Sequence, residues 1–306
     1  MKLQEQFVRN VRHCFKERGD IWLNKLPDLI RYCEQKWSLR IEEPYSLSIN
    51  YVAPAKKVNG QEVVVKLCLP GDDFLAELEA LQLFQDRGIV QLLAFDQEQG
   101  ILILEKILPG QELADVTDDE AACLIAADLF KNLMTEVPKK TRIGTTKKRE
   151  EKLREIVKSH PHGLGPISRV RLKNALKVFT YLNATIERHW LLHGDFHPYN
   201  ILLSNDGNWK VIDPKGLLGE AEYDLIQFLL NKLPEDGSYE VMKNRVDVFT
   251  QQLQLNKKRM ILWGYCHAVL ATSWSVNGTQ YSTSFFKGIG IFERLFTEYY
   301  GTDIDI

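Results

Sequence analysis

The stretch that decides the fold reads His193-Gly194-Asp195-Phe196-His197-Pro198-Tyr199-Asn200. We expect it to follow a long helix that ends near Trp190 and to be flanked by apolar residues on both sides. Glycine and proline bend the chain, so a carboxylate and a carboxamide five residues apart can point into one site from a rigid loop. A turn in which the aspartate merely caps an amide is the structural alternative. The combination H-G-D-x-H-x-x-N favours catalysis over that alternative.

A hairpin is predicted directly after this stretch. Residues 201–203 and 210–212 are short β-rich runs, and Asn205-Asp206-Gly207-Asn208 between them is typical of a tight turn. Phosphoryl transfer needs a carboxylate beside the acceptor hydroxyl and hard oxygen ligands for magnesium. Asp195 meets the first need. Asn200 and Asp213, one at each end of the hairpin, meet the second.

The same reaction needs a positive charge on the nucleotide phosphates. Lys66 follows a run of valines on a predicted strand, and Glu77 on the next helix could hold it. Glu79 competes for that role. An exposed lysine at the end of a strand, with a solvated helix face, is the alternative explanation.

Residues 1–106 are predicted to form a helical start followed by a small antiparallel α+β lobe. Strands are expected at 45–51, 63–69 and 101–104, with Asn59-Gly60 as a hairpin turn between the first two and a helix over 73–84. Residues 107–306 are predicted to form a mainly helical lobe. In it, Thr117 to Glu120 has the pattern of a capping box, and 260–286 are too polar to cross a bilayer and indicate a buried helix and loop.

These motifs resemble those of the aminoglycoside phosphotransferases, a branch of the protein-kinase-like superfamily. The catalytic stretch, Ile212-Asp-Pro-Lys-Gly-Leu217, Val64-Val-Lys-Leu67 and Leu102-Ile-Leu-Glu105 are similar to the streptomycin-6-phosphotransferase and hydroxyurea-resistance kinase group, over roughly residues 48–224. The resemblance implies a bilobal protein-kinase-like fold with a small antiparallel-sheet N-terminal lobe and a mainly helical C-terminal lobe.

The resemblance also implies a role for each matching residue. Asp195 would be the catalytic base, and His197 would approach the transferred phosphate. Asn200 and Asp213 would bind magnesium, and Lys66 with Glu77 would anchor the phosphates of ATP. Backbone groups from Glu105 to Ile107 would bind adenine at a hinge between the lobes. Two departures stand out: no glycine-rich loop at residues 50–53, and Pro-Lys in place of Phe-Gly after Asp213, so a kinase-type activation switch is not expected.

The composition limits the kinds of partner that we expect for this protein. The chain has 306 residues, 44% of them apolar and 26% charged, with a formal net charge of −2, which gives no general attraction for nucleic acid or an acidic membrane. Five scattered cysteines indicate neither disulfides nor a zinc site. The first twenty residues lack the apolar core of a secretion signal, so a cytoplasmic protein is expected. The sequence leaves the oligomeric state open.

The predicted function is therefore an ATP- and magnesium-dependent kinase of a small hydroxylated molecule, with a streptomycin-like aminoglycoside as the acceptor that the resemblance suggests. A sugar or amino alcohol is the alternative acceptor, because acidic and basic residues nearly balance over 214–306. A nucleotide-binding scaffold without turnover and a protein kinase are the two competing functions. His193 is expected to be structural, and Asp224 to hold the catalytic loop by hydrogen bonds.

Overall fold

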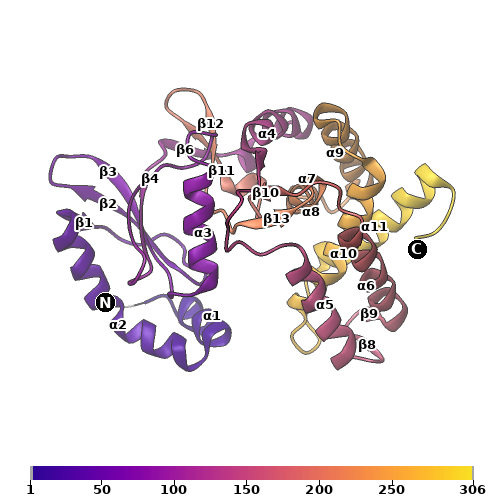
Figure 1. The fold of residues 1–306 in the computed structure, drawn as a ribbon, viewed down its shortest axis with the longest axis horizontal. Coiled ribbons are helices and arrows are strands. Elements are labelled where there is room, and N and C mark those ends of the chain that lie inside the picture. The colour runs from indigo at the N-terminus through magenta and orange to yellow at the C-terminus, as the bar shows by residue number, and fades with distance from the viewer. Residues whose placement is uncertain (1–2, 305–306) are drawn as a thin grey trace. The chain divides into compact units, whose positions relative to one another are not determined.

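The structure is a computed structural model that describes residues 3–304 (Figure 1). The chain divides into two compact units, Met1–Pro109 and Gly110–Ile306. None of the helices within residues 3–304 is long and apolar enough to cross a membrane.

The first unit is built on a five-stranded antiparallel sheet in the order β1-β2-β3-β5-β4. The strands are β1 (Leu39–Ile41), β2 (Tyr51–Lys57), β3 (Glu62–Leu67), β4 (Leu92–Asp96) and β5 (Ile101–Glu105). Asn59 and Gly60 lie in the turn between β2 and β3, as predicted, and Gly60 adopts a φ of 87° that glycine tolerates without strain.

The strand predicted at 45–51 was placed too early, because the structure begins β2 only at Tyr51. Pro54 makes this part of the sequence look unlike a strand, because a proline has no backbone N–H to donate to a neighbouring strand. In the structure β1 pairs only as far as Ile41 opposite Ala55, so Pro54 lies just past the paired part of β1. Its carbonyl accepts the Glu42 amide at 2.9 Å, and no donor is needed from its nitrogen there.

Two helices, α1 (Glu5–Phe15) and α2 (Glu17–Trp37), cover one face of this sheet (Figure 1). Strand residues alternate between faces, so Val63 and Val65 of β3 pack with Phe7 and Trp22 of the helices. Lys66, the residue after Val65, therefore points to the opposite face. Helix α3 (Asp72–Leu83) contacts it there through Glu77.

The second unit is mainly helical, as predicted. Its helices are α4 (Asp119–Leu133), α5 (Lys147–Ser159), α6 (Arg169–Ala184), α7 (Ala221–Asp224), α8 (Ile226–Leu230), α9 (Ser238–Leu253), α10 (Lys257–Ser275) and α11 (Thr283–Tyr300), with short 3-10 turns η1 (Leu113–Asp115) and η2 (Pro198–Asn200). Helix α10 is buried from Met260 to Ser273 and packs against α6 and α11, which confirms the predicted buried helix. Helix α4 is capped by Asp118 rather than Thr117, because the Asp118 carboxylate accepts two first-turn amides.

Short strands in the second unit position the predicted loop. The order β13-β10-β7 joins β13 (Leu217–Gly219), β10 (Trp190–Leu192) and β7 (Thr135–Glu136), and the order β12-β11-β6 joins β12 (Trp209–Val211), β11 (Ile201–Ser204) and β6 (Pro109–Glu112). A separate pair is β8 (Gly163–Leu164) with β9 (Ile167–Ser168). The predicted hairpin is confirmed as β11 and β12. The helix expected to end near Trp190 instead ends at Ala184, because β10 pairs on both sides, with β7 and with β13.

Together the two units make an α+β fold: an antiparallel sheet with helices in the first, and a helical body with short strands in the second.

Candidate functional site

The loop from His193 to Asn200 leaves β10 and enters β11, so both of its ends are anchored in sheets. Phe196 is fully buried in the middle of the loop, and its ring lies 5.3 Å from that of Phe130 and 6.3 Å from that of Phe228. Burying an aromatic ring of this size holds the loop firmly to the helical body. The polar residues on either side of Phe196 are thereby fixed in place.

Asp224 on α7 holds the first turn of this loop, as predicted. Its two carboxylate oxygens accept the backbone amides of His193 and Gly194, both at 2.6 Å. Burial raises the pKa of Asp224 to about 7, while these two hydrogen bonds oppose the rise. The loop backbone is therefore positioned by a carboxylate thirty residues further along the chain.

His193 is structural, which confirms the prediction for it. The ring is fully buried, its Nε2 lies 3.0 Å from the Ile212 carbonyl, and its Nδ1 accepts the Asp195 amide at 3.3 Å. Burial lowers the pKa of His193 to about 3, so the ring is neutral near pH 7 and donates from Nε2. This histidine links the loop to the strand before Asp213.

Asp195 and His197 are two neighbouring polar side chains of the loop that are partly accessible. Their side chains are 24% and 18% exposed, and His197 Nε2 lies 3.7 Å from Asp195 Oδ1. His197 Nδ1 is buried and has no hydrogen-bond partner within residues 3–304. Burial lowers the pKa of His197, and the carboxylates of Asp195 and Asp213 oppose this. The arrangement presents a carboxylate beside an uncharged imidazole.

Asn200 and Asp213 are brought together by the β11–β12 hairpin, because the Ile212 amide donates to the Asn200 carbonyl at 2.9 Å. The Asn200 side-chain amide donates to the Asp195 carbonyl at 3.0 Å, which directs its Oδ1 elsewhere. Lys215 Nζ lies 2.5 Å from Asp213 Oδ2. An amide oxygen and a carboxylate on one short hairpin form a donor set that fits magnesium, which takes few protein ligands and completes its shell with water and phosphate.

Lys66 and Glu77 form a buried ion pair in the first unit. Lys66 Nζ lies 2.5 Å from Glu77 Oε1, and both residues are 4% exposed. Burying two charges is unfavourable, so such a pair is weak evidence for stability and better evidence for a functional lysine. The predicted contact of Glu77 with the lysine is present, whereas the role of the pair toward a nucleotide stays a prediction.

Glu105 ends β5 and is tied to the chain before β4. Its amide donates to the Gln91 carbonyl at 3.0 Å, and its carboxylate accepts the Gln91 amide at 2.8 Å. The backbone N–H of Glu105 is thus already used. Ile107, two residues further along, is buried.

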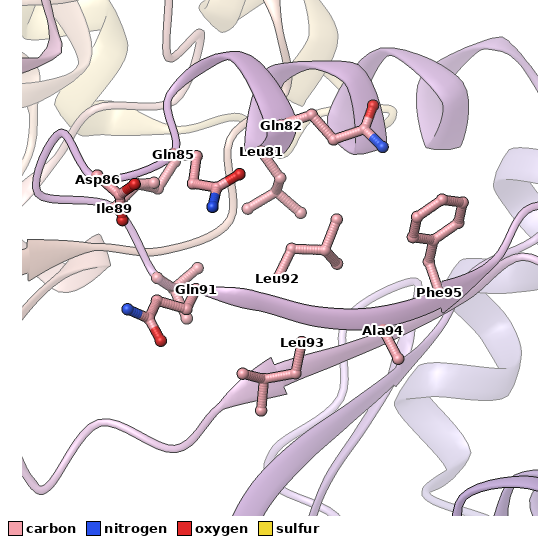
Figure 2. Close-up of a pocket in the computed structure, with 11 residues that line it drawn as sticks. Leu81, Gln82, Gln85, Asp86, Ile89, Gln91, Leu92, Leu93, Ala94 and Phe95 are labelled. Carbon is pink, nitrogen blue, oxygen red and sulfur yellow. The ribbon is translucent and has the colours of Figure 1, made fainter.

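A cavity of about 210 Å³ lies between α3 and β4 in the first unit, with Leu81 of the helix facing Leu92 of the strand (Figure 2). Gln82, Gln85 and Gln91 are among the residues around it. Neither Lys66 nor Glu77 lines it, whereas Gln91, which does line it, is hydrogen-bonded to Glu105.

Within each unit the structure therefore assembles the predicted residues into a local group. Asp195, His197, Asn200 and Asp213 lie on one loop and hairpin of the second unit, and Lys66 and Glu77 meet in the first. Sequence reasoning missed the link from Gln91 to Glu105. The two are joined mainly through backbone groups, which leave no mark in side-chain patterns.

Solved structures of similar proteins identify the fold. A choline kinase from Streptococcus pneumoniae superimposes with a TM-score of 0.62 at 17% identity, covering 89% of this chain and all of that one. An aminoglycoside phosphotransferase in complex with ADP and hygromycin B gives the same TM-score at 14% identity, covering 90% of this chain and all of that one. At such low identity these likenesses establish the fold, which is protein-kinase-like as predicted.

The family follows from the sequence. Residues 40–278 match the family described as aminoglycoside/hydroxyurea antibiotic resistance kinase, and the chain belongs to it. Streptomycin 6-kinase of Streptomyces glaucescens is 26% identical over 282 residues, 90% of this chain and 91% of that protein. Hydroxyurea phosphotransferase of Kitasatospora aureofaciens is 26% identical over 84% of this chain and 75% of its own length. The protein is thus a phosphotransferase with a hydroxyl group as its acceptor.

Proposed function

We propose that the protein transfers the γ-phosphate of ATP, in the presence of magnesium, to a hydroxyl group of a small molecule. The observation that carries the proposal is the state of Asp195, whose carboxylate is partly exposed although the backbone before it is pinned by Asp224 and the backbone after it by buried Phe196. A carboxylate held rigidly and left open to a substrate is suited to orienting and deprotonating a hydroxyl.

The remaining residues fill complementary roles in this proposal. Asn200 and Asp213 would hold magnesium, which when bound neutralises charge on the phosphates. His197 lies beside Asp195 as a neutral ring able to donate one hydrogen bond to a phosphate oxygen. Lys66, oriented by Glu77, would bind phosphate oxygens of the nucleotide.

The backbone from Glu105 to Ile107 would receive adenine. Because the Glu105 amide is bonded to Gln91, the Glu105 carbonyl and the Ile107 amide are the groups that we assign to the base. No glycine-rich loop is needed in this scheme, since other backbone amides would cover the phosphates.

The test is ADP release with and without magnesium over aminoglycosides, sugars, amino alcohols and hydroxyurea. We expect release that depends on magnesium and on one acceptor class. Nucleotide binding without transfer to any compound in the panel would instead support a scaffold without turnover, and labelling of added proteins would support a protein kinase.

Streptomycin is the first acceptor to test, because two of the similar proteins are named streptomycin 6-kinases. A second acceptor class is a non-antibiotic metabolite such as a sugar or amino alcohol. It is favoured because two carboxylates that could attract a cationic antibiotic, those of Glu220 and Glu222, are already bonded within the protein. Glu220 binds Arg259 and Trp263, both at 2.7 Å, and Glu222 accepts the Asn256 amide at 2.9 Å. Asp305, which could have added acidity, lies outside the described residues.

A further inference from the structure

The connection between β1 and β2 is held by two amide side chains near the start of the chain. Gln4, directly before α1, donates from Nε2 to the Tyr45 carbonyl at 2.8 Å and accepts the Leu47 amide on Oε1 at 2.9 Å. One carboxamide therefore bonds the connection through one donor and one acceptor, as a neighbouring strand would. Asn10 of α1 donates from Nδ2 to the Ser48 carbonyl at 3.2 Å.

Apolar packing holds the same part of the connection. Leu47 is buried and belongs to the apolar core of the first unit, together with Phe7 and Val11 of α1. Ser46 and Ser48, the residues on either side of it, are exposed. The connection is therefore anchored to α1 at one point, while the residues next to that point stay open to solvent.

Backbone amides at the end of the connection are available to a ligand. The amides of Ser48, Ile49 and Asn50 make no hydrogen bond within residues 3–304, and the backbone bends at all three residues. Consecutive amides in a bent segment can point together at one anion, and backbone amides arranged in this way bind phosphate oxygens. Such a segment therefore offers donors for a phosphate without needing a cationic side chain.

These amides directly precede the part of β2 that pairs with Lys66. Asn50 is followed by Tyr51, the first residue of β2, and Val52 is the residue of β2 opposite Lys66. Residues 51–53, where a glycine-rich loop was sought in the sequence, lie within β2 itself, so the connection before β2 takes the place of that loop. The free amides and the lysine that we assign to the nucleotide phosphates thus belong to adjacent strands at the same end of the sheet.

We propose that Gln4 and Asn10 are positioning residues for the nucleotide, because they hold the connection between β1 and β2 so that the amides of residues 48–50 bind its phosphates. The inference rests on the proposed kinase function and deepens it, since it assigns the amides that cover the phosphates and the side chains that fix them. Neither side chain binds the nucleotide itself. Both precede residue 40, at which the match to the family begins, so this anchor lies outside the matched region.

Calorimetry with ATP, ADP and adenosine in the presence of magnesium tests the positioning role. We expect Gln4→Ala to weaken ATP binding about tenfold, to weaken ADP binding less, and to leave adenosine binding within about twofold of the wild type. Asn10→Ala removes one hydrogen bond and should weaken ATP binding about threefold. Arg9→Ala is the matched control, because Arg9 lies on the same helix and its ion pair is with the exposed Glu5. Unchanged ATP binding in Gln4→Ala, or equal weakening of all three ligands, would overturn the proposal.

Amide hydrogen exchange in the wild type locates the contact. We expect ADP to slow exchange at residues 48–50 and adenosine to leave it unchanged, whereas Gln4→Ala should remove most of this protection and speed exchange at Leu47. Equal exchange at residues 48–50 with and without ADP would overturn the proposal. Protection by ADP together with no phosphate transfer to any acceptor would reject the kinase function and leave the positioning role standing. A wild-type protein that binds no nucleotide would reject both.

Discussion

The Asp224 carboxylate accepts the backbone amide of Gly194 at 2.6 Å, and this contact sets the backbone from which Asp195 projects. Its second oxygen holds the preceding amide at the same distance. In the proposed mechanism, the buried Asp224 carboxylate positions the loop and the more exposed Asp195 carboxylate acts on the substrate.

The stability of the protein should depend on Asp224 in a defined pH window. Burial raises the pKa of Asp224 from 3.8 to about 7. The folded chain thus binds a proton at Asp224 more tightly than the unfolded chain does. The contribution of this proton to the free energy of unfolding is complete below about pH 4 and is lost as the pH rises to about 7. We expect the stability advantage of the wild type over Asp224→Asn to shrink between about pH 4 and about pH 7 in urea unfolding. An advantage that grows with pH in this window would contradict the assignment.

Asp195→Ala should lower turnover by about a hundredfold or more, because the carboxylate acts on the hydroxyl in the transition state. Nucleotide affinity and melting temperature should stay nearly unchanged. Steady-state kinetics, nucleotide titration and thermal unfolding measure the three quantities. Asp236→Ala, at an exposed loop position, is the control. Near-normal turnover in Asp195→Ala would remove this residue from the mechanism.

Asp213→Ala should abolish the magnesium dependence of nucleotide binding, because a charged ligand of a hard cation is lost. Magnesium titrations of nucleotide binding by calorimetry measure it. The partner variant Lys215→Ala removes the cation 2.5 Å from Asp213 and should strengthen the response to magnesium. If both variants titrate like the wild type, the metal is held elsewhere.

Lys66→Met should raise the Michaelis constant for ATP and lower stability by about 3–5 kcal/mol, because the buried Glu77 carboxylate loses this partner. The double variant Lys66→Met/Glu77→Leu should recover much of the stability and none of the activity. Chemical unfolding and ATP kinetics separate the two effects. Recovery of activity with stability would mean that the lysine acts only in the fold.

Gly194→Ala should reduce both stability and turnover. Gly194 has a φ of 81°, and a Cβ there would lie 3.3 Å from the Cβ of Lys215. The left-handed backbone alone costs about 1–2 kcal/mol for an L-residue. Gly207→Ala is the matched control, since Gly207 has a φ of 79° and open space around it. Only Gly194→Ala should lose turnover. Equal turnover in the two variants would show that the loop tolerates a side chain at position 194.

Local sequence patterns determined much of this protein. Residue types within short windows indicate the loop from His193 to Asn200, the hairpin after it, the Asn59-Gly60 turn and the burial of α10. Such features depend on backbone preferences and periodicity, which neighbouring residues set by themselves. The roles of Asp195, Asn200 and Asp213 remain predictions, although the structure places their side chains on one loop and hairpin.

Tertiary structure decided the rest. Strand β2 runs through Pro54 because β1 ends opposite Ala55, and β10 replaces the end of a predicted helix because two distant strands pair with it. The engagement of Glu220 by Arg259 and the approach of Arg149 to Trp274 also join segments far apart in the chain. Packing between such segments decides which charged side chains are paired within the protein and which stay available to a substrate. No local sequence pattern contains that information.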